Sequence, residues 1–169
     1  QNISIWAGAG NDTLFMADGA VIVGSFDGQG GVDTLDYSAV TNDLEIRLSG
    51  QLGYSDGFDG TITGISHGFY NMEAVISGQG NDSFYGRDAS AVFDLAEAGN
   101  TYTDRASGRS FAFAAIENIY GGVLDDIFNL RGNLVMNLYG QDGDDIFNFF
   151  GLAVLDGLLD GGRGTDKLD

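Results

Sequence analysis

The stretch that decides the fold is Gly161-Gly162-Arg163-Gly164-Thr165-Asp166-Lys167-Leu168-Asp169, which follows the pattern G-G-x-G-x-D-x-U-x with a large apolar residue at U. Glycines at the first, second and fourth positions let the backbone curl tightly, through conformations that a side chain hinders. The sixth position places a carboxylate in this turn, and Leu168 then returns the chain towards an apolar interior. The stretch therefore predicts a polar surface turn between two strands.

The same register recurs five more times along the chain. Aspartates align with Asp166 at the following positions: Asp12, Asp33, Asp82, Asp126 and Asp145. In all six copies, the residue two places after the aspartate and the residue seven places before it are apolar. One copy departs from the pattern, because Leu124 replaces the fourth-position glycine. A fixed register across six turns predicts that the turns stack on one another.

The spacing of the aligned aspartates indicates the length of one repeat. The intervals are 21, 49, 44, 19 and 21 residues, so the two long intervals look like double steps. The 154 residues from Asp12 to Asp166 divide into seven intervals that average 22 residues. We therefore expect coils of about 22 residues, two of which lack the motif and lie near residues 56–60 and 104–108. Alternating residues at 44–48 and 111–113 predict strands with one buried face.

The composition is acidic and lacks both cysteine and proline. Its 25 acidic and 7 basic residues give a net charge of −18, which destabilises a compact domain unless cations neutralise it. No basic run is present, so nucleic acid is excluded as a partner. Without cysteine, a metal must bind to hard oxygen ligands, which suit Ca²⁺. No apolar run approaches the ~18 residues of a membrane span, and the N-terminus shows no secretion signal.

The six turns resemble the nonapeptide repeats of the RTX family, which occurs in secreted bacterial toxins, hydrolases and large surface adhesins. Residues 33–38, 72–78 and 116–121 are similar to the degenerate repeats of such adhesins, so the resemblance covers most of the chain. The resemblance implies Ca²⁺ as the cofactor and export as an unfolded chain that folds outside the cell or at the bacterial cell surface. The chain departs from the tandem pattern of the family in carrying one motif per coil.

The motif, its spacing and the resemblance together predict an all-β fold, namely a right-handed parallel β-solenoid of the β-roll or β-helix type. Its glycine turns are expected to stack along one edge and hold ions, whereas packing alone holds the opposite edge. A single unit is expected over residues 1–169. We expect this unit to be a fragment of a longer repeat protein, because the chain starts without Met and ends directly after a motif.

Ca²⁺ binds about six to eight oxygen atoms, so each ion is expected between the turns of two successive coils. Backbone carbonyls and aspartate carboxylates would supply those oxygens. The predicted metal ligands are the six aligned aspartates and the following turn residues: Gly8, Gly10, Asn11, Gly28, Gly31, Gly78, Gly80, Asn81, Asp125, Gly140, Gly143, Asp144, Gly162 and Gly164. Asp125, Asp142 and Asp144 either add ligands or only carry charge.

Three pairs of motif aspartates lie one coil apart: Asp12 with Asp33, Asp126 with Asp145, and Asp145 with Asp166. Each pair is predicted to flank one site, so the turn of Asp145 would face two ions. Asp82 has no intact neighbour within one coil, and its site depends on whether Asp59 or Asp104 substitutes.

We expect no enzymatic activity, no catalytic residue and no organic cofactor. The sequence has no HExxH and no cysteine nucleophile, and His67 is its only histidine. G-x-S-x-G occurs at residues 53–57 and 64–68, but a nucleophile elbow needs a helix after the serine, and no stretch shows helical periodicity. Its six arginines share no register with the aspartates. These features favour a structural calcium-binding module of a secreted surface protein, adhesin or filament. The alternative is a calcium-dependent module that binds or modifies polysaccharide.

Trp6, Tyr120 and Tyr139 occupy the same position just before a turn. They either stack on one another along the outer face, which parallel repeats favour, or bind sugar rings. The expected partners are thus calcium ions, together with surface polysaccharide or further copies of the chain joined end to end.

Overall fold

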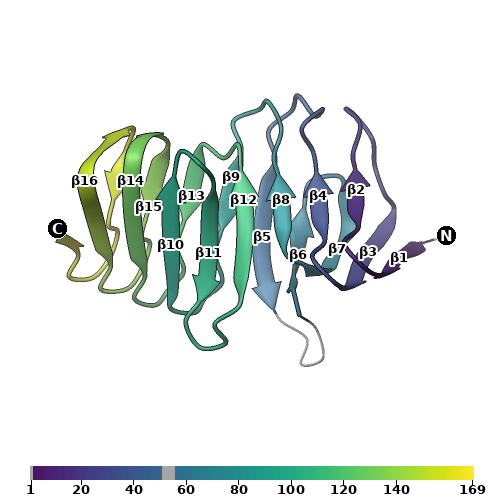
Figure 1. Cartoon of the computed structure of the whole chain (residues 1–169), viewed down its shortest axis with the longest axis horizontal. Helices are drawn as coiled ribbons and strands as arrows, with labels where there is room; N and C mark the ends of the chain where they lie inside the picture. The colour runs from purple at the N-terminus through teal and green to yellow at the C-terminus, as the bar shows by residue number, and fades with distance from the viewer. Residues whose placement is uncertain (1, 51–55) are drawn as a thin grey trace.

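The computed structural model describes residues 2–50 and 56–169, which form an all-β fold without helices (Figure 1). Their strands make two mixed sheets of nine strands each. The first sheet has the spatial order β1 (Ile3–Ala9), β3 (Gly24–Gly30), β7 (Ile65–Met72), β6 (Phe58–Ile62), β5 (Glu45–Gly50), β9 (Ser83–Tyr85), β13 (Asn118–Tyr120), β15 (Asn137–Tyr139) and β17 (Leu159–Asp160). The second has the order β18 (Lys167–Leu168), β16 (Ile146–Asp156), β14 (Ile127–Val135), β10 (Ala91–Ala96), β11 (Asn100–Asp104), β12 (Ser110–Ala114), β8 (Ala74–Ile76), β4 (Thr34–Asp36) and β2 (Thr13–Phe15).

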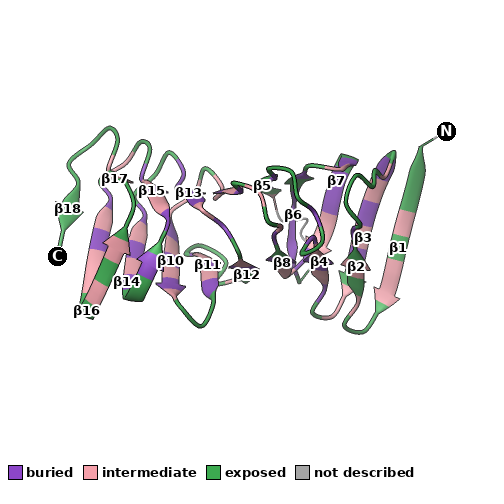
Figure 2. Cartoon of the chain, turned by 90° about the horizontal axis from the view of Figure 1, so that it is seen from above, coloured by how far each residue is buried: buried purple, intermediate pink, exposed green. Residues whose placement is uncertain are grey.

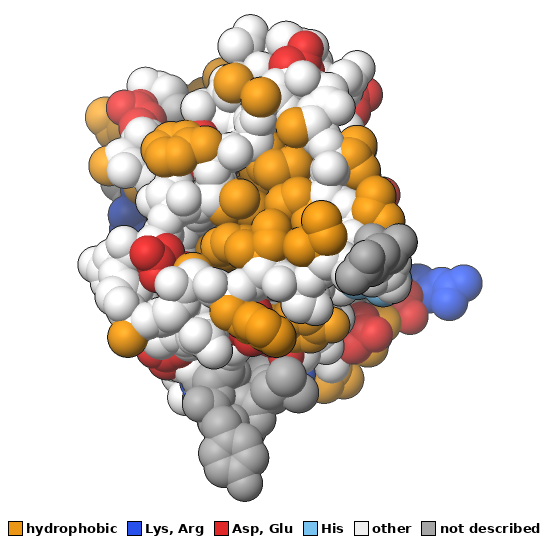
Figure 3. Space-filling model, turned by 90° about the vertical axis from the view of Figure 1, so that its right-hand side faces the viewer, with side chains coloured by type: hydrophobic (Ala, Val, Ile, Leu, Met, Phe, Trp, Pro, Cys, Tyr) orange, Lys and Arg blue, Asp and Glu red, His pale blue; other side chains and the backbone are white. Residues whose placement is uncertain are grey.

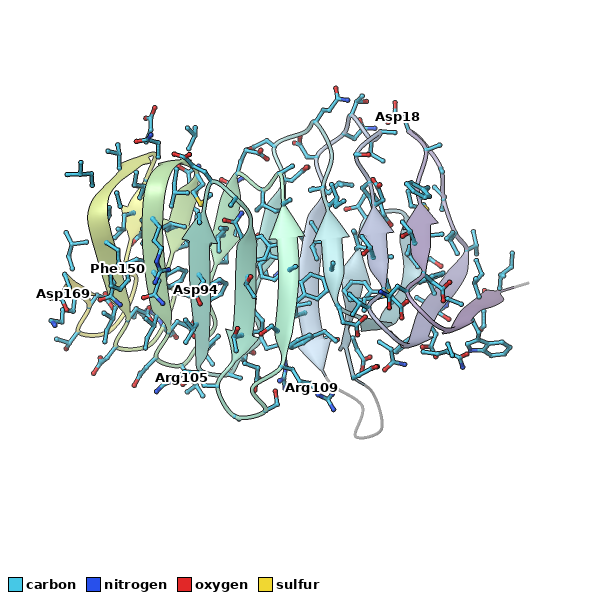
Figure 4. The ribbon with its side chains drawn as sticks, in the orientation of Figure 1. Asp18, Asp94, Arg105, Arg109, Phe150 and Asp169 are labelled. Atoms are coloured by element: carbon cyan, nitrogen blue, oxygen red, sulfur yellow. The ribbon has the colours of Figure 1, made fainter. Side chains whose placement is uncertain are left out.

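The chain crosses between the two sheets at two edges. The motif turns at 7–12, 28–33, 121–126, 140–145 and 161–166 cross from the first sheet to the second along the lower side of Figure 1, which we call the motif edge. The chain returns on the opposite edge, for example through residues 16–23 and 37–44. There Asp18 accepts hydrogen bonds from the backbone N–H and the hydroxyl of Thr41, both at 3.1 Å, and so ties two return segments together (Figure 4).

Strands that flank the motif turns pair in parallel and in the predicted register. Before the turns, Ile119 aligns with Leu138, and Leu138 aligns with Leu159. After the turns, Phe128 aligns with Phe147. These side chains face the core, because alternate residues of a strand point to the same side of a sheet. The predicted repetition of apolar positions around each aspartate is thus confirmed on the motif edge.

Two antiparallel excursions interrupt this parallel pairing, so the expectation of purely parallel strands is wrong. β5, β6 and β7 pair antiparallel in the first sheet, and β10, β11 and β12 pair antiparallel in the second. The excursions occupy the two long intervals between motif aspartates, where the sequence predicts coils without the motif. Antiparallel strands need only a short local connection, so these segments stay within one sheet without a motif turn.

The first excursion moves the third motif turn to the other edge. After β7, residues 71–73 cross to β8 on the motif edge, beside the turn 28–33. The next crossing is the motif turn 77–82, which runs from the second sheet back to the first. It lies on the opposite edge, where the N–H of Gln79 donates to the carbonyl of Val40 at 2.9 Å. The prediction of six turns along one edge is therefore wrong for Gly78, Gly80, Asn81 and Asp82.

One hydrophobic core lies between the two sheets and is rich in aromatic rings. Phe93, Phe128 and Phe147 form a stack with centroid distances of 4.6 and 4.8 Å. These distances match the ~4.8 Å spacing of adjacent strands, so equivalent rings pack face to face along the sheet. Nearer the centre, Phe58 packs edge to face against Tyr102 with centroids 5.6 Å apart. Aromatic packing thus links the parallel region to the excursions.

Burial falls off towards both ends of the sheets (Figure 2). The terminal strands β1 and β18 contain no buried residue. The view onto the N-terminal end shows apolar side chains open to solvent (Figure 3). Ile3, Phe15 and Val21 are 55%, 74% and 67% exposed, respectively. The interior is therefore not covered at this end.

A ladder of tyrosines runs along the outer face of the first sheet. The rings of Tyr85, Tyr120 and Tyr139 are stacked nearly parallel, with centroid distances of 4.2 and 4.4 Å. The predicted stacking is confirmed for Tyr120 and Tyr139, whereas it is wrong for Trp6. Trp6 lies on the terminal strand β1, where it aligns with Asp27 and is 68% exposed. Its place in the stack belongs to Tyr85, which follows a motif turn instead of preceding one.

We predict that Phe128→Ala lowers the free energy of unfolding by about 3–5 kcal/mol, because it removes the middle ring of a buried stack and leaves a cavity. Leu152→Ala serves as the control, since Leu152 is 94% exposed and its loss should change stability by no more than about 0.5 kcal/mol. Urea unfolding followed by circular dichroism measures both values. Equal effects of the two substitutions would contradict the assignment of the core.

Candidate metal centre

The aspartates on the motif edge point into their own turns. Asp33, Asp126 and Asp145 are almost completely buried, with 0%, 1% and 0% exposure. The first glycine of the turn makes room for this carboxylate. A Cβ atom on Gly28 or Gly140 would lie only 2.4 or 2.1 Å from Oδ2 of the aspartate in the same turn. Close approach of the carboxylate therefore excludes a side chain at Gly28 and Gly140, whereas Ala7 stands at the first position of the first turn.

Three motif carboxylates also contact the preceding turn. Asp33 Oδ1 accepts the backbone N–H of Asp12 at 2.8 Å, and Asp145 Oδ1 accepts that of Asp126 at 2.8 Å. Asp166 Oδ1 accepts the N–H of Asp145 at 3.1 Å. We call this series of bonds the carboxylate ladder. It brings together all three of the aspartate pairs that the sequence predicts to be neighbours.

The second oxygen of several ladder carboxylates has no partner. Among the described residues, Oδ2 of Asp12, Asp33 and Asp145 is buried and accepts no hydrogen bond. Such an oxygen costs free energy, because water no longer solvates its charge. Burial raises the pKa of Asp145 to about 6, even though the bond from the Asp126 N–H lowers it. Burial is also the main cause of the raised pKa of Asp33.

Asp126 has a different environment, because the first residue of β10 lies beside it in place of a motif turn. Its Oδ1 accepts the N–H of Ala91 at 2.7 Å, and its Oδ2 accepts the N–H of Gly122 at 2.7 Å. Burial still raises the pKa of Asp126 to about 7, and these two bonds only oppose the shift. Of the neighbouring pair Asp126 and Asp145, only Asp145 therefore has a carboxylate oxygen without a partner.

Backbone carbonyls of one turn lie directly against glycines of the next turn. A Cβ atom on Gly31 would lie 1.9 Å from the carbonyl oxygen of Gly10, and one on Gly164 would lie 1.8 Å from that of Gly143. Both later glycines have a positive φ, at 141° and 138°. The predicted glycine positions of successive turns are thus in contact, which brings carbonyl oxygens to the same edge as the carboxylates.

Residues at the fifth motif position form a second set of contacts between turns. Asn11 Oδ1 accepts the N–H of Val32 at 2.9 Å, and Asp125 Oδ1 accepts that of Asp144 at 2.9 Å. Asp144 Oδ1 in turn accepts the N–H of Thr165 at 2.8 Å. These side chains, which the sequence offers as metal ligands, each bind the backbone of the following turn. Their hydrogen bonds fix the distance between turns.

Asp82, on the opposite edge, is surrounded by hydrogen-bond donors. Its Oδ1 accepts the N–H of Leu44 at 2.8 Å, and its Oδ2 accepts the Ser77 hydroxyl at 2.5 Å and the Gly78 N–H at 2.9 Å. The hydroxyl donor is available because Ser77 stands at the first motif position, where glycine or alanine stands in the other turns. The carboxylate of Asp82 is therefore bonded at both oxygens without a cation.

Neither of the two predicted substitutes reaches Asp82. Asp104 forms an ion pair with Arg87 at 2.6 Å, and donors of Ser107 together with Arg87 lower its pKa against the opposing effect of burial. Asp59 lies in β6 and accepts the N–H of Asn71 at 3.3 Å. A metal site that combines Asp82 with either residue is thus not formed.

Two glutamates that the sequence reasoning missed complete the carboxylate ladder. Glu73 Oε2 accepts the N–H of Asp33 at 2.5 Å, and Glu117 Oε2 accepts the N–H of Asp82 at 2.8 Å. Each glutamate accepts the aspartate N–H that, in the other turns, is accepted by the aspartate of the following motif. A signal was present, because both glutamates stand two residues before an apolar position that precedes a motif turn. Glu73 Oε1 is also buried without a partner, and burial raises the pKa of Glu73 to about 7.

Carboxylate side chains alone do not form a metal cage in residues 2–50 and 56–169. No group of three or more His, Cys, Asp or Glu side chains in these ranges is arranged to hold a metal ion. The unpartnered oxygens of the motif edge are instead distributed along the stack of turns. A cation at this edge would therefore need carbonyl oxygens in addition to carboxylates, as Ca²⁺ sites commonly do.

Comparison with known proteins gives no family assignment. No family model matches the sequence, and no curated protein matches it. Within the described part of the chain, no helix is long and apolar enough to cross a membrane.

We predict that the metal-free protein is more stable in mild acid than at neutral pH. The folded-state pKa values of Asp126, Glu73 and Asp145 are raised to about 7, 7 and 6, so these groups bind protons in the fold at a pH where the unfolded chain has released them. Their contribution is complete below about pH 4 and is lost as the pH rises through 6 to 7.

Thermal melting in chelator between about pH 5 and pH 8 measures this dependence. The expected result is a melting temperature that falls as the pH rises. A melting temperature that rises over the same range would contradict the burial of these carboxylates.

Proposed function

We propose that this chain is a calcium-binding structural module of a secreted bacterial surface protein, adhesin or filament, and that it has no catalytic activity. The observation that carries the proposal is the set of buried carboxylate oxygens without a partner, on Asp12, Asp33, Asp145 and Glu73. A folded protein seldom leaves such groups unpaired, because each costs free energy. A bound cation would remove that cost.

The kind of oxygen on the motif edge favours Ca²⁺ over other metals. Carboxylates and backbone carbonyls are hard ligands, and the described residues contain no cysteine, while the single histidine, His67, bonds to Ser66 and Asn2. Asp12 with Asp33, and Asp126 with Asp145 and Asp166, would hold the ions together with carbonyls of the glycine turns. Ca²⁺ would neutralise the carboxylates and cross-link successive turns.

We further propose that the two sheets are the walls of a right-handed parallel β-solenoid with two antiparallel interruptions. Support comes from the in-register parallel pairs that flank the motif turns, at a repeat of 19 to 21 residues between adjacent aspartates on the motif edge. In such a stack each turn depends on its neighbours, so ions between turns would stabilise the whole rod. This also supports the resemblance to RTX repeats.

The absence of catalysis is supported by the positions of the arginines, which a calcium-dependent lyase or epimerase would use as a base near the ion. Arg87, Arg47 and Arg131 form ion pairs with Asp104, Glu45 and Asp94 at 2.6, 2.6 and 3.0 Å. Arg105 and Arg109 lie in or next to the connection between β11 and β12 (Figure 4). Arg163 is in a motif turn, where its backbone N–H donates to the carbonyl of Gln141 at 2.6 Å.

We predict that Ca²⁺ drives folding of this chain, with weak sites of ~10⁻⁴ to 10⁻³ M, as in other extracellular modules. Circular dichroism and thermal melting, each with Ca²⁺ and with excess chelator, test the prediction. The expected result is a gain of sheet signal and of melting temperature on Ca²⁺ addition. Mg²⁺ at the same concentration is the control, because it demands a smaller and more regular site. Identical spectra and melting curves in all three solutions would refute the proposal.

We predict that Asp145→Ala and Asp82→Ala respond differently to Ca²⁺. Asp145→Ala should lower the melting temperature more with Ca²⁺ than in chelator, because it strips the acceptor from the N–H of Asp126 in both solutions but removes a cation ligand only when Ca²⁺ is present. Asp82→Ala should cost about 1–3 kcal/mol with or without Ca²⁺, since it strips the acceptor from the buried N–H of Leu44 and from Gly78. Melting both variants in both solutions decides the matter. An equal loss for Asp145→Ala in both solutions would contradict a role in calcium binding.

A further inference from the structure

The tyrosine ladder is covered at one end and open at the other. The guanidinium of Arg47 lies 3.5 Å from the centroid of Tyr85 and caps that end of the stack. Tyr120 lies between Tyr85 and Tyr139, so both of its faces are covered. Among the described residues, neither an aromatic ring nor a cation is stacked on the second face of Tyr139. One tyrosine face thus remains available.

The next rung of the sheet leaves space over this face. Tyr139 aligns with Asp160, a much shorter side chain. Asp160 Oδ1 turns back to accept the N–H of Gly162 at 3.1 Å. A surface cavity of about 260 Å³ lies here. It is lined by Tyr120 and Tyr139 and by polar residues in and next to two motif turns. The volume is below the ~300–1,000 Å³ of sites for drug-sized ligands, so it suits a single small ring.

The polar lining combines donors and acceptors around the tyrosine. Gln141 and Asp142 come from one turn, Asp160 is the last residue of β17, and Arg163 comes from the turn that follows it. The two turns are held together here, because the N–H of Arg163 donates to the carbonyl of Gln141 at 2.6 Å. Gln141 has φ at 81°, in the left-handed region that non-glycine residues seldom adopt. Gln29, at the same motif position of another turn, has φ at 70°, so this backbone conformation belongs to the motif turn.

This combination matches the chemistry of a neutral sugar. A pyranose ring presents a face of C–H groups that packs on the electron-rich face of an aromatic ring, while its hydroxyls both donate and accept hydrogen bonds. Asp142 and Asp160 would accept from hydroxyls, and Arg163 and Gln141 would donate to them. A uronate or a nucleotide fits less well, because its negative charge would meet these two carboxylates and a net charge of −18.

We propose that the open face of Tyr139 is a binding site for one ring of a neutral saccharide. The site goes beyond the structural role of calcium, since none of its side chains belongs to the carboxylate ladder. It gives this module a direct contact with glycans at a position near the C-terminal end of the sheets.

The experiment measures binding of cellobiose and lactose by saturation-transfer NMR and by calorimetry, with Ca²⁺ present throughout. We expect millimolar affinity, because a single stacked ring and a few hydrogen bonds provide limited binding energy. Tyr139→Ala should weaken binding about tenfold or more. Tyr85→Ala is the matched control, because it removes a tyrosine of the same ladder whose faces are already covered, and it should leave the affinity unchanged within about twofold.

A third variant separates loss of the site from loss of the fold. Asp160→Tyr places a fourth ring over Tyr139, so it should abolish sugar binding. Its circular dichroism spectrum should match that of the parent protein, and its melting temperature should be at least as high. The proposal is overturned if neither sugar gives saturation transfer at ~10 mM. It is also overturned if Tyr85→Ala and Tyr139→Ala weaken binding equally, or if Asp160→Tyr is folded and still binds.

Discussion

Buried carboxylates in the glycine turns are the constraint on which the motif edge depends. Asp33, Asp145 and Asp166 each lie against the first glycine of their own turn and accept a backbone N–H of the preceding turn, so one side chain shapes its own turn and joins it to another. The glycines follow from this arrangement, because a Cβ atom would occupy the space of the carboxylate. The same arrangement removes the carboxylate from water and leaves an oxygen on Asp12, Asp33 and Asp145 unpaired. Burial of these carboxylates thus both shapes the turns and leaves the unpaired oxygens on which the calcium proposal rests.

The two edges show alternative ways to satisfy a buried aspartate. On the opposite edge, the hydroxyl of Ser77 and two backbone amides saturate Asp82. On the motif edge, glycine stands where that serine stands, and Asp145 lacks an equivalent donor. The Ser77 hydroxyl thus completes the hydrogen bonds of Asp82, whereas Asp145 keeps an unpartnered oxygen. The first motif residue does not decide this alone, because Asp126 follows Gly121 and is still bonded at both oxygens by the N–H groups of Ala91 and Gly122.

The middle of the molecule is stabilised mainly by packing. There the antiparallel excursions replace the motif turns, and Glu73 and Glu117 end the carboxylate ladder where no further aspartate follows. Aromatic rings such as Phe58, Tyr102 and Phe111 fill the core at this level. The ion pair of Arg87 with the buried Asp104 neutralises a charge that would otherwise need a cation. The excursions therefore join two acidic, turn-based regions through a region in which aromatic packing and one ion pair replace the motif turns.

The sequence by itself determined the all-β class, the glycine turns, the apolar register on either side of them and the three aspartate neighbours. These features depend on residues within one turn or on an exact repeat between turns, both of which are visible in the chain. Only the tertiary structure decided that the turn of Asp82 lies on the opposite edge, that Glu73 and Glu117 complete the ladder, and that Tyr85 takes the place of Trp6. Each of these depends on which strands pair across the two excursions. Within the first excursion the spatial order of the strands is β7, β6, β5, the reverse of their order in the chain. No local sequence pattern predicts that reversal, because strand pairing is set by contacts between distant segments.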